Sequence, residues 1–190
     1  MDYHIDRDTF IDIMPQELEE NNYHMLKGAY TSRKGDRYLF ANCGFYKQDK
    51  ESGKFYPLFD PLPKLKTGII EAVYQDEMSR YWLASVNELA VYSEKGEFIK
   101  RFDVSKDQCG FRTRFMPLKD SRFAVTLQTD EIWIFDGSSA QIGEPEHIKL
   151  PFKDIYTLLT DKHGRIWFAT DGDGLWYTDD ALTNNAHYVQ

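Results

Sequence analysis

Residues 155–176 read IYTLLTDKHGRIWFATDGDGLW, a pattern of short apolar segments separated by polar turns. The segments Ile155 to Asp161 and Arg165 to Thr170 are rich in β-branched and aromatic residues, which suit the half-buried surface of a pleated strand. The turns at 162–164 and 171–174 contain glycines, which adopt the positive φ that tight hairpins require. The stretch therefore predicts consecutive antiparallel strands joined by hairpins.

The central strand of this stretch recurs along the chain. Segments in which an aromatic or apolar strand follows an arginine begin at Arg37, Arg80, Arg122 and Arg165, which are 43, 42 and 43 residues apart. Propeller blades of four strands repeat every ~40–50 residues, whereas a helical repeat would show 3.6-residue periodicity. The repeat therefore predicts an all-β protein of about four four-stranded antiparallel β-propeller blades, a partial or small propeller.

The repeat also sets the expected domain organisation. We expect blades at about 23–60, 69–103, 111–150 and 155–190. Residues 1–22 stand outside the repeat; Tyr3 to Ile13 could be a strand of another blade, or Pro15 to Glu20 could form a helical turn after a proline start. Because four blades leave exposed faces at both ends, we expect self-association or packing against remaining blades of a longer parent protein.

Composition narrows the class of protein. The chain has 190 residues, of which 42% are hydrophobic and 28% charged, which argues against disorder, and its aromatic content of 15% favours β structure. Its net charge of −8 disfavours nucleic acid as a partner. No apolar run approaches the ~18 residues of a membrane span, so this segment is not expected to insert into a membrane. Cys43 and Cys109 are read as thiols in preference to a disulfide, because no framework of cysteines is visible.

Residues 155–176 resemble a two-component regulator propeller repeat. The shared features are Asp161, the glycine turn, the strand Ile166-Trp167-Phe168 with Ala169 and Thr170 after it, and a glycine-rich turn before Leu175. The second repeat is similar, but Val86-Asn87 replaces the glycine-rich turn, and the first and third match only in their central strand.

This resemblance implies a function. Such repeats build the periplasmic sensor region of bacterial hybrid two-component receptors, which recognise carbohydrate fragments and signal to a histidine kinase. The resemblance therefore implies a periplasmic, non-enzymatic sensor segment that binds an oligosaccharide or similar small ligand. A chain complete as given would instead be cytoplasmic, because its charged start at 1–8 lacks a signal peptide.

The expected ligand-binding residues lie in loops at one end of the blades. In a propeller, the turns between second and third strands share an end with the connections between blades, and loops carry binding groups. Amide and carboxylate side chains there can hydrogen-bond to sugar hydroxyls. The candidates are Asn42, Asn87, Asp130, Asp171, Asp173 and Trp176, with Asp60, Lys64, Asp107 and Asp154 in the blade connections.

Other interpretations are weaker. The Asp171-Gly172-Asp173-Gly174 turn invites a calcium site, but no EF-hand loop surrounds it and a plain hairpin is favoured. We expect no metal, no cofactor and no catalytic residue, since no phosphate loop or nucleophile elbow is present. Trp82 and Trp167 hold equivalent positions and are expected to pack between blades. The alternative function is a protein-interaction scaffold without a small-molecule ligand.

Overall fold

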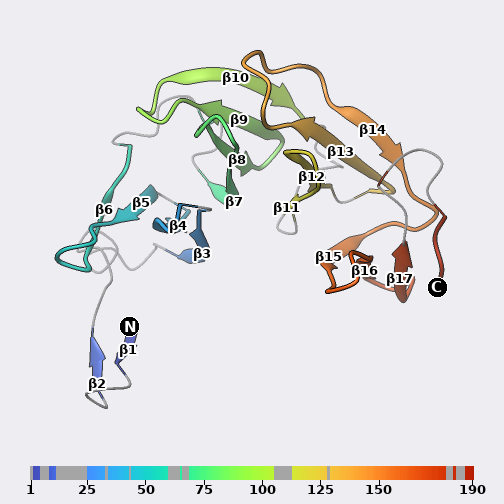
Figure 1. Ribbon diagram of the computed structural model, residues 1–190, viewed down its shortest axis with the longest axis horizontal. Coiled ribbons are helices and arrows are strands. Elements are labelled where there is room, and N and C mark those ends of the chain that lie inside the picture. Colours follow the sequence, from blue (N-terminus) through green and yellow to red (C-terminus); the bar gives the residue numbers. More distant parts are fainter. Residues whose placement is uncertain are drawn as a thin grey trace.

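The computed structural model shows four β-propeller blades side by side in an arc, which confirms the predicted fold class (Figure 1). It describes residues 2–4, 9–11, 25–32, 34–42, 44–59, 65, 69–104, 113–127, 129–178, 182 and 187–190. The first strand of each blade lies on the concave side of the arc and the later strands lie toward the outside (Figure 1). Inner strands of neighbouring blades contact one another along this side.

The blades follow the chain order, and each sheet is antiparallel. The first blade contains β3 (Leu26–Thr31), β4 (Arg37–Ala41), β5 (Gly44–Gln48) and β6 (Phe55–Pro57). The second contains β7 (Ile70–Gln75), β8 (Tyr81–Ser85), β9 (Glu88–Tyr92) and β10 (Phe98–Asp103). The third contains β11 (Arg114–Pro117), β12 (Arg122–Thr126), β13 (Glu131–Asp136) and β14 (Glu146–Lys149).

The fourth blade is less complete among the described residues. It contains β15 (Ile155–Thr160), β16 (Ile166–Thr170) and β17 (Leu175–Thr178), and a single bridge from Tyr177 to Val189 begins a fourth strand. Outside the blades, β1 (Asp2–His4) pairs with β2 (Thr9–Ile11). Cys43, Cys109 and the possible helical turn at 15–20 lie outside the described residues.

The core lies between blades, because alternate residues of each strand face opposite neighbours. Tyr38 and Phe45 of the first blade pack against Tyr81 of the second, and the Tyr38 and Tyr81 hydroxyls are 2.9 Å apart. Burial, with hydrogen bonding between the two phenols, raises the pKa of Tyr81. The next residue of β8, Trp82, faces the third blade instead. The sheets are therefore layers held together by aromatic contacts.

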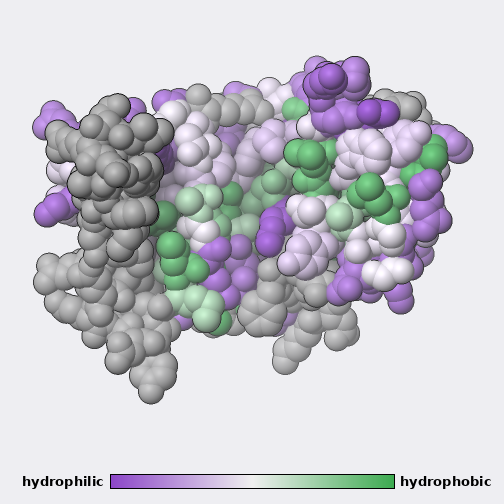
Figure 2. Space-filling view, turned by 90° about the horizontal axis from the view of Figure 1, so that it is seen from below, coloured by the Kyte–Doolittle hydropathy of each residue, from purple (hydrophilic) through white to green (hydrophobic). Residues whose placement is uncertain are grey.

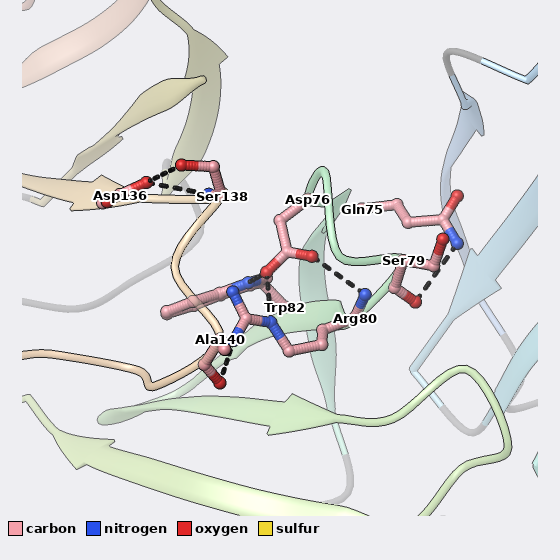
Figure 3. A network of polar contacts seen from close by, with 8 residues as sticks. All are labelled: Gln75, Asp76, Ser79, Arg80, Trp82, Asp136, Ser138 and Ala140. Carbon is pink, nitrogen blue, oxygen red and sulfur yellow. Dashed lines mark hydrogen bonds and ion pairs between the residues drawn. The ribbon is translucent and has the colours of Figure 1, made fainter. Parts of the chain in front are cut away.

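The contact between the second and third blades confirms the predicted packing role of Trp82. Its indole is fully buried and lies 4.9 Å from the Phe123 ring and 4.7 Å from the Phe135 ring, measured between centroids. Beside it, the Asp76 carboxylate accepts hydrogen bonds from Arg80 Nε (2.6 Å) and Trp82 Nε1 (2.8 Å). Figure 3 shows this network, in which Arg80 also donates to the Ala140 carbonyl of the third blade.

The fourth blade repeats this network on a face that no described blade covers. Asp161 accepts hydrogen bonds from Arg165 Nε (2.8 Å) and Trp167 Nε1 (3.0 Å). Here, however, the Arg165 side chain is 36% exposed, whereas the Arg80 side chain is 8% exposed. Leu159 and Leu175 on the same face are 65% and 52% exposed. We call this surface the open face: it forms an apolar hollow of about 320 Å³ lined by Thr157, Leu158, Leu159, Asp161, Trp167, Ala169 and Leu175.

The structure corrects the alignment of the first repeat. The amides of Ser32, Asp76 and Asp161 donate to the carbonyls of Asp36, Arg80 and Arg165 respectively. Asp36, and not Arg37, is therefore the counterpart of Arg80. The sequence comparison was one residue out of register here, because Arg37 follows the turn in the position that Tyr81 holds in the second blade. In place of the arginine, Asp36 forms ion pairs with Lys47 and Lys50.

Candidate functional site

One candidate site among the described residues is a hollow on the concave side of the arc, to which three blades contribute. We call it the concave hollow. It has a volume of about 410 Å³ and is lined by Lys27, Gly28, Ala29, Tyr30, Phe40, Glu71, Ala72, Val73, Arg114 and Phe115. Figure 2 views the molecule from this side and shows hydrophilic residues beside hydrophobic ones near the middle of the surface. The residues come mainly from the inner strands β3, β7 and β11, so three blades contribute to one site.

Equivalent β-bulges place two of the charged side chains. The pairing of β3 with β4 skips Lys27, and the pairing of β7 with β8 skips Glu71. The same irregularity occurs in the fourth blade, where Tyr156 is the extra residue and is 54% exposed. A bulge residue has no partner opposite it and its side chain is re-aimed relative to the regular pleat. Each of these blades therefore presents one irregular side chain near the start of its inner strand.

Glu71 is the most unusual group in the hollow. Its side chain is only 4% exposed, and Oε1 lies 3.3 Å from Lys27 Nζ, whose side chain is 17% exposed. The same oxygen accepts no hydrogen bond within the described part of the chain. A buried carboxylate normally accepts several hydrogen bonds, because burial without them is costly. The Lys27–Glu71 pair therefore leaves a carboxylate oxygen without a hydrogen bond just beneath the wall of the hollow.

Aromatic rings form the other part of the lining. The Tyr30 hydroxyl accepts a hydrogen bond from the Gln75 amide at 3.1 Å, which ties β3 to β7. The Phe115 ring stacks on Tyr74 at 5.8 Å, which holds Phe115 in place from behind. A Cβ at Gly28 would lie 2.6 Å from the end of the Phe40 ring, so this position needs glycine for the ring to reach the hollow. The aromatic rings that line the hollow are therefore held in place by contacts with residues outside the lining.

The loop residues predicted from sequence lie elsewhere. Asn42 holds the start of the first blade, because its side-chain oxygen accepts a hydrogen bond from the Met25 amide at 2.9 Å. Asn87 forms the tight turn after β8 with φ at +67°, and its carbonyl accepts from the Val104 amide. Both contacts are structural, and neither residue lines the concave hollow.

The candidates of the third and fourth blades also hold their loops together. Asp130 lies 3.4 Å from Lys149, and the Asp171 amide donates to the Asp154 carbonyl. Asp173 accepts a hydrogen bond from the Lys153 amide through its side chain and from the Trp176 indole through its carbonyl.

Trp176 packs against Phe152 at 5.1 Å, at the edge of the core between the third and fourth blades. A role for these six residues in ligand binding stays a prediction.

Some sequence expectations fall outside this picture. Asp60, Lys64 and Asp107 lie outside the described residues. Within the described ranges, no group of three histidine, cysteine or carboxylate side chains could hold a metal ion.

The concave hollow was missed because the sequence reasoning looked for binding groups in loops. One signal was available: Lys27 and Glu71 are separated by about one repeat length, as the central strands are.

Comparisons with known proteins agree with the fold and with the predicted repeat. A family model described as the two component regulator propeller matches residues 149–172, which confirms the resemblance seen in the fourth repeat. No curated protein sequence matches the chain.

The solved structures similar to this chain include extracellular domains of putative two-component systems and a lyase. The extracellular domain of a putative hybrid two component system from B. thetaiotaomicron superposes with a TM-score of 0.72 at 17% identity, covering 93% of this chain and 24% of that one. A second such domain from the same organism gives 0.62 at 14% identity, covering 88% and 21%. Virginiamycin B lyase from Staphylococcus aureus gives 0.61 at 15% identity, covering 86% and 54%. At these identities the likeness establishes the propeller fold, and this chain spans about a quarter of the length of the first two structures.

Proposed function

We propose that this chain is a ligand-sensing propeller segment of a two-component system sensor, which binds an oligosaccharide or similar small ligand in the concave hollow. The observation that carries the proposal is the hollow itself, where three inner strands bring a buried carboxylate, two cations and aromatic rings together. Its volume of about 410 Å³ lies in the range of small-molecule sites, which are mostly apolar with a few placed polar groups. The six loop residues would act as supports of the scaffold.

The signalling part of the proposal rests on the similar structures. Two of them are described as extracellular domains of putative hybrid two component systems. In such a sensor the present chain would lie in the periplasm, and ligand binding would be relayed to a histidine kinase. Within the described residues, no helix is long and apolar enough to cross a membrane. A ligand that bridges β3, β7 and β11 would change the packing of three blades at once, which gives binding a route to the rest of the protein.

We propose binding in preference to catalysis. The described lining contains one carboxylate, Glu71, and its ion pair with Lys27 holds it in position at 3.3 Å. General acid–base work on a sugar bond ordinarily uses two carboxylates on opposite sides of it. The similarity to virginiamycin B lyase concerns the fold and carries none of that enzyme's chemistry to this chain.

The open face supports a separate proposal about the partner. The matching face between the second and third blades is covered by Phe123 and Phe135. We propose that a further blade of a longer polypeptide covers the open face in the same way. A second copy of the chain fits less well, because the opposite terminal face, formed by Leu39, Ala41, Tyr46 and Phe55, is already buried.

The binding proposal is tested by screening saccharides against the purified chain and measuring thermal stabilisation. A ligand at 100 times its Kd stabilises the native state by about 2.7 kcal/mol, which is readily detected. The Ala29→Trp variant places a large ring at an exposed wall of the concave hollow, and Ile99→Trp is the matched control on β10. We expect stabilisation that Ala29→Trp removes and Ile99→Trp keeps. Stabilisation by no saccharide, or equal stabilisation of both variants, would refute the proposal.

A further inference from the structure

The charges of the concave hollow point to a class of ligand. Resting on the proposed function, we propose that the hollow accepts a carboxylate-bearing saccharide, with Arg114 binding the carboxylate and Glu71 accepting hydrogen bonds from sugar hydroxyls. The argument uses the sign of the local charge, the pairing of the three ionisable groups and the arrangement of the rings.

The sign of the local charge is opposite to that of the whole protein. The chain carries a net charge of −8. The ionisable side chains that line the hollow are Lys27, Glu71 and Arg114, and their sum is +1. An acidic protein repels anions over most of its surface, so a cationic hollow concentrates the attraction for an anionic ligand at this site.

The pairing of these groups gives each one a different role. Lys27 is neutralised by Glu71 at 3.3 Å. Arg114 is half-buried, and no carboxylate lies within ion-pair distance of it among the residues that the structure describes. One guanidinium nitrogen donates to the Thr113 carbonyl at 2.9 Å, which orients the group beside its own strand. A guanidinium is a planar fork of donors that matches a carboxylate, so Arg114 is the group suited to bind one.

The carboxylate of Glu71 supplies the opposite hydrogen-bonding character. Its Oε1 accepts no hydrogen bond from the described residues, and its side chain is 4% exposed. An ionised carboxylate can only accept, so its partner must present O–H or N–H groups. Sugar hydroxyls provide such donors, whereas a simple carboxylate ion does not. Among the described residues, the hollow thus holds a cation without an ion-pair partner and a carboxylate oxygen that is ion-paired to Lys27 but accepts no hydrogen bond. This combination fits a molecule that has both a carboxylate and hydroxyls.

The rings add the apolar contact that a sugar requires. Tyr30 and Phe115 line the hollow on different strands, β3 and β11. Arg114 and Phe115 are adjacent in sequence, and the Phe115 ring is held by Tyr74 at 5.8 Å. The cation is therefore built onto the same rigid strand as one of the rings, which is the arrangement that fixes the orientation of a bound ligand.

The test uses matched pairs of oligosaccharides that differ only at C6, where the acidic member has a carboxylate and the neutral member has a hydroxymethyl group. The pairs are α-1,4-linked galacturonate and galactose trimers, β-1,4-linked glucuronate and glucose trimers, and β-1,4-linked mannuronate and mannose trimers. Calorimetry on the full chain gives the affinity for each. We expect at least one acidic trimer to bind about 10- to 100-fold more tightly than its neutral partner, the range set by a charge-assisted hydrogen bond.

Two variants locate the effect. Arg114→Gln should remove the preference for the acidic trimer, and Lys119→Gln is the control, since it makes the same change of charge at an exposed site of the same blade. Glu71→Gln should weaken the acidic and neutral members of a pair by similar factors, because it acts on the hydroxyls. Circular dichroism of each variant checks that the fold is kept.

The outcomes separate this inference from the proposed function. A neutral trimer that binds as tightly as its acidic partner, or a preference that survives Arg114→Gln, would overturn the ligand class and leave saccharide binding in the hollow intact. Failure of every acidic trimer to bind would also overturn the ligand class. The proposed function fails separately, when the wider saccharide screen finds no ligand sensitive to Ala29→Trp.

Discussion

Removal of the Asp76 carboxylate should be much more damaging than removal of its counterpart Asp161. Asp76 accepts hydrogen bonds from Arg80 N at 2.9 Å, Arg80 Nε at 2.6 Å and Trp82 Nε1 at 2.8 Å. Its side chain is fully buried and that of Arg80 is 8% exposed. Asp76→Ala would strand a buried cation without its partner, which costs about 3–5 kcal/mol. That is a large part of the roughly 5–15 kcal/mol that a domain of ordinary stability has in total.

The same bonds in the fourth blade provide the comparison. Asp161 accepts from Arg165 N, Arg165 Nε and Trp167 Nε1 at 3.1, 2.8 and 3.0 Å. Because the Arg165 side chain is 36% exposed, water can replace the lost carboxylate, and Asp161→Ala should destabilise the protein much less. The two variants make the same chemical change and differ in burial.

Urea unfolding followed by fluorescence gives both free energies of unfolding. We expect a clear fall in the midpoint for Asp76→Ala, with an unchanged slope, and a small fall for Asp161→Ala. Adding Arg80→Met to Asp76→Ala should restore part of the loss, because the stranded charge is removed. Equal losses for the two aspartates, or no recovery with Arg80→Met, would show that burial of the ion pair is not the cause.

Three further predictions follow from the geometry. Gly28→Ala should lower the free energy of unfolding by about 1–3 kcal/mol, measured in urea, because the added Cβ would lie 2.6 Å from a buried ring. The hydrogen bond from Trp167 holds the pKa of the Asp161 carboxyl well below its usual value near 3.9. The contribution of Asp161 to the free energy of unfolding is therefore present above about pH 4 and is lost as the pH falls further. In an acid titration, Asp161→Ala should lose stability less steeply than the wild type. If the wild-type chain is a monomer, replacing Leu159 and Leu175 with glutamate should lower its binding of an apolar fluorescent dye, because both leucines are exposed on the open face. If the wild type is instead a dimer that this double change dissociates, the open face is the contact with a second copy.

Sequence reasoning reached the fold because its signals repeat. The central strands recur at nearly constant spacing, and Trp82 and Trp167 occur at the same place in their strands, so the blade and its packing could be predicted together. The one-residue error at Arg37 arose because several residues fit the same alternating pattern. In the structure, the hydrogen bond from the Ser32 amide to the Asp36 carbonyl and the pairing of Thr31 with Arg37 fix the register of that hairpin.

The site was harder to predict than the fold. A β-bulge depends on where the register of two paired strands shifts, and the amino-acid types at Lys27 and Glu71 do not predict that shift. The loop candidates were chosen for their chemistry, but a polar side chain in a turn often satisfies neighbouring backbone groups, as Asn42 does for Met25. Arg114 lines the same hollow as Lys27 and Glu71 only because the blades are arranged in an arc, and the sequence of a single blade does not predict that arrangement.

The β-bulges allow the side chains of the site to vary independently of the residues that hold each blade together. A residue that stands outside the ladder can be exchanged without disturbing cross-strand pairs, and the three equivalent positions already hold lysine, glutamate and tyrosine. A gene that duplicates such a blade inherits one variable position near the start of its inner strand together with an unchanged framework. Changes of specificity during evolution can therefore accumulate at these three codons, while the aromatic layers between the sheets stay under a different and stricter selection.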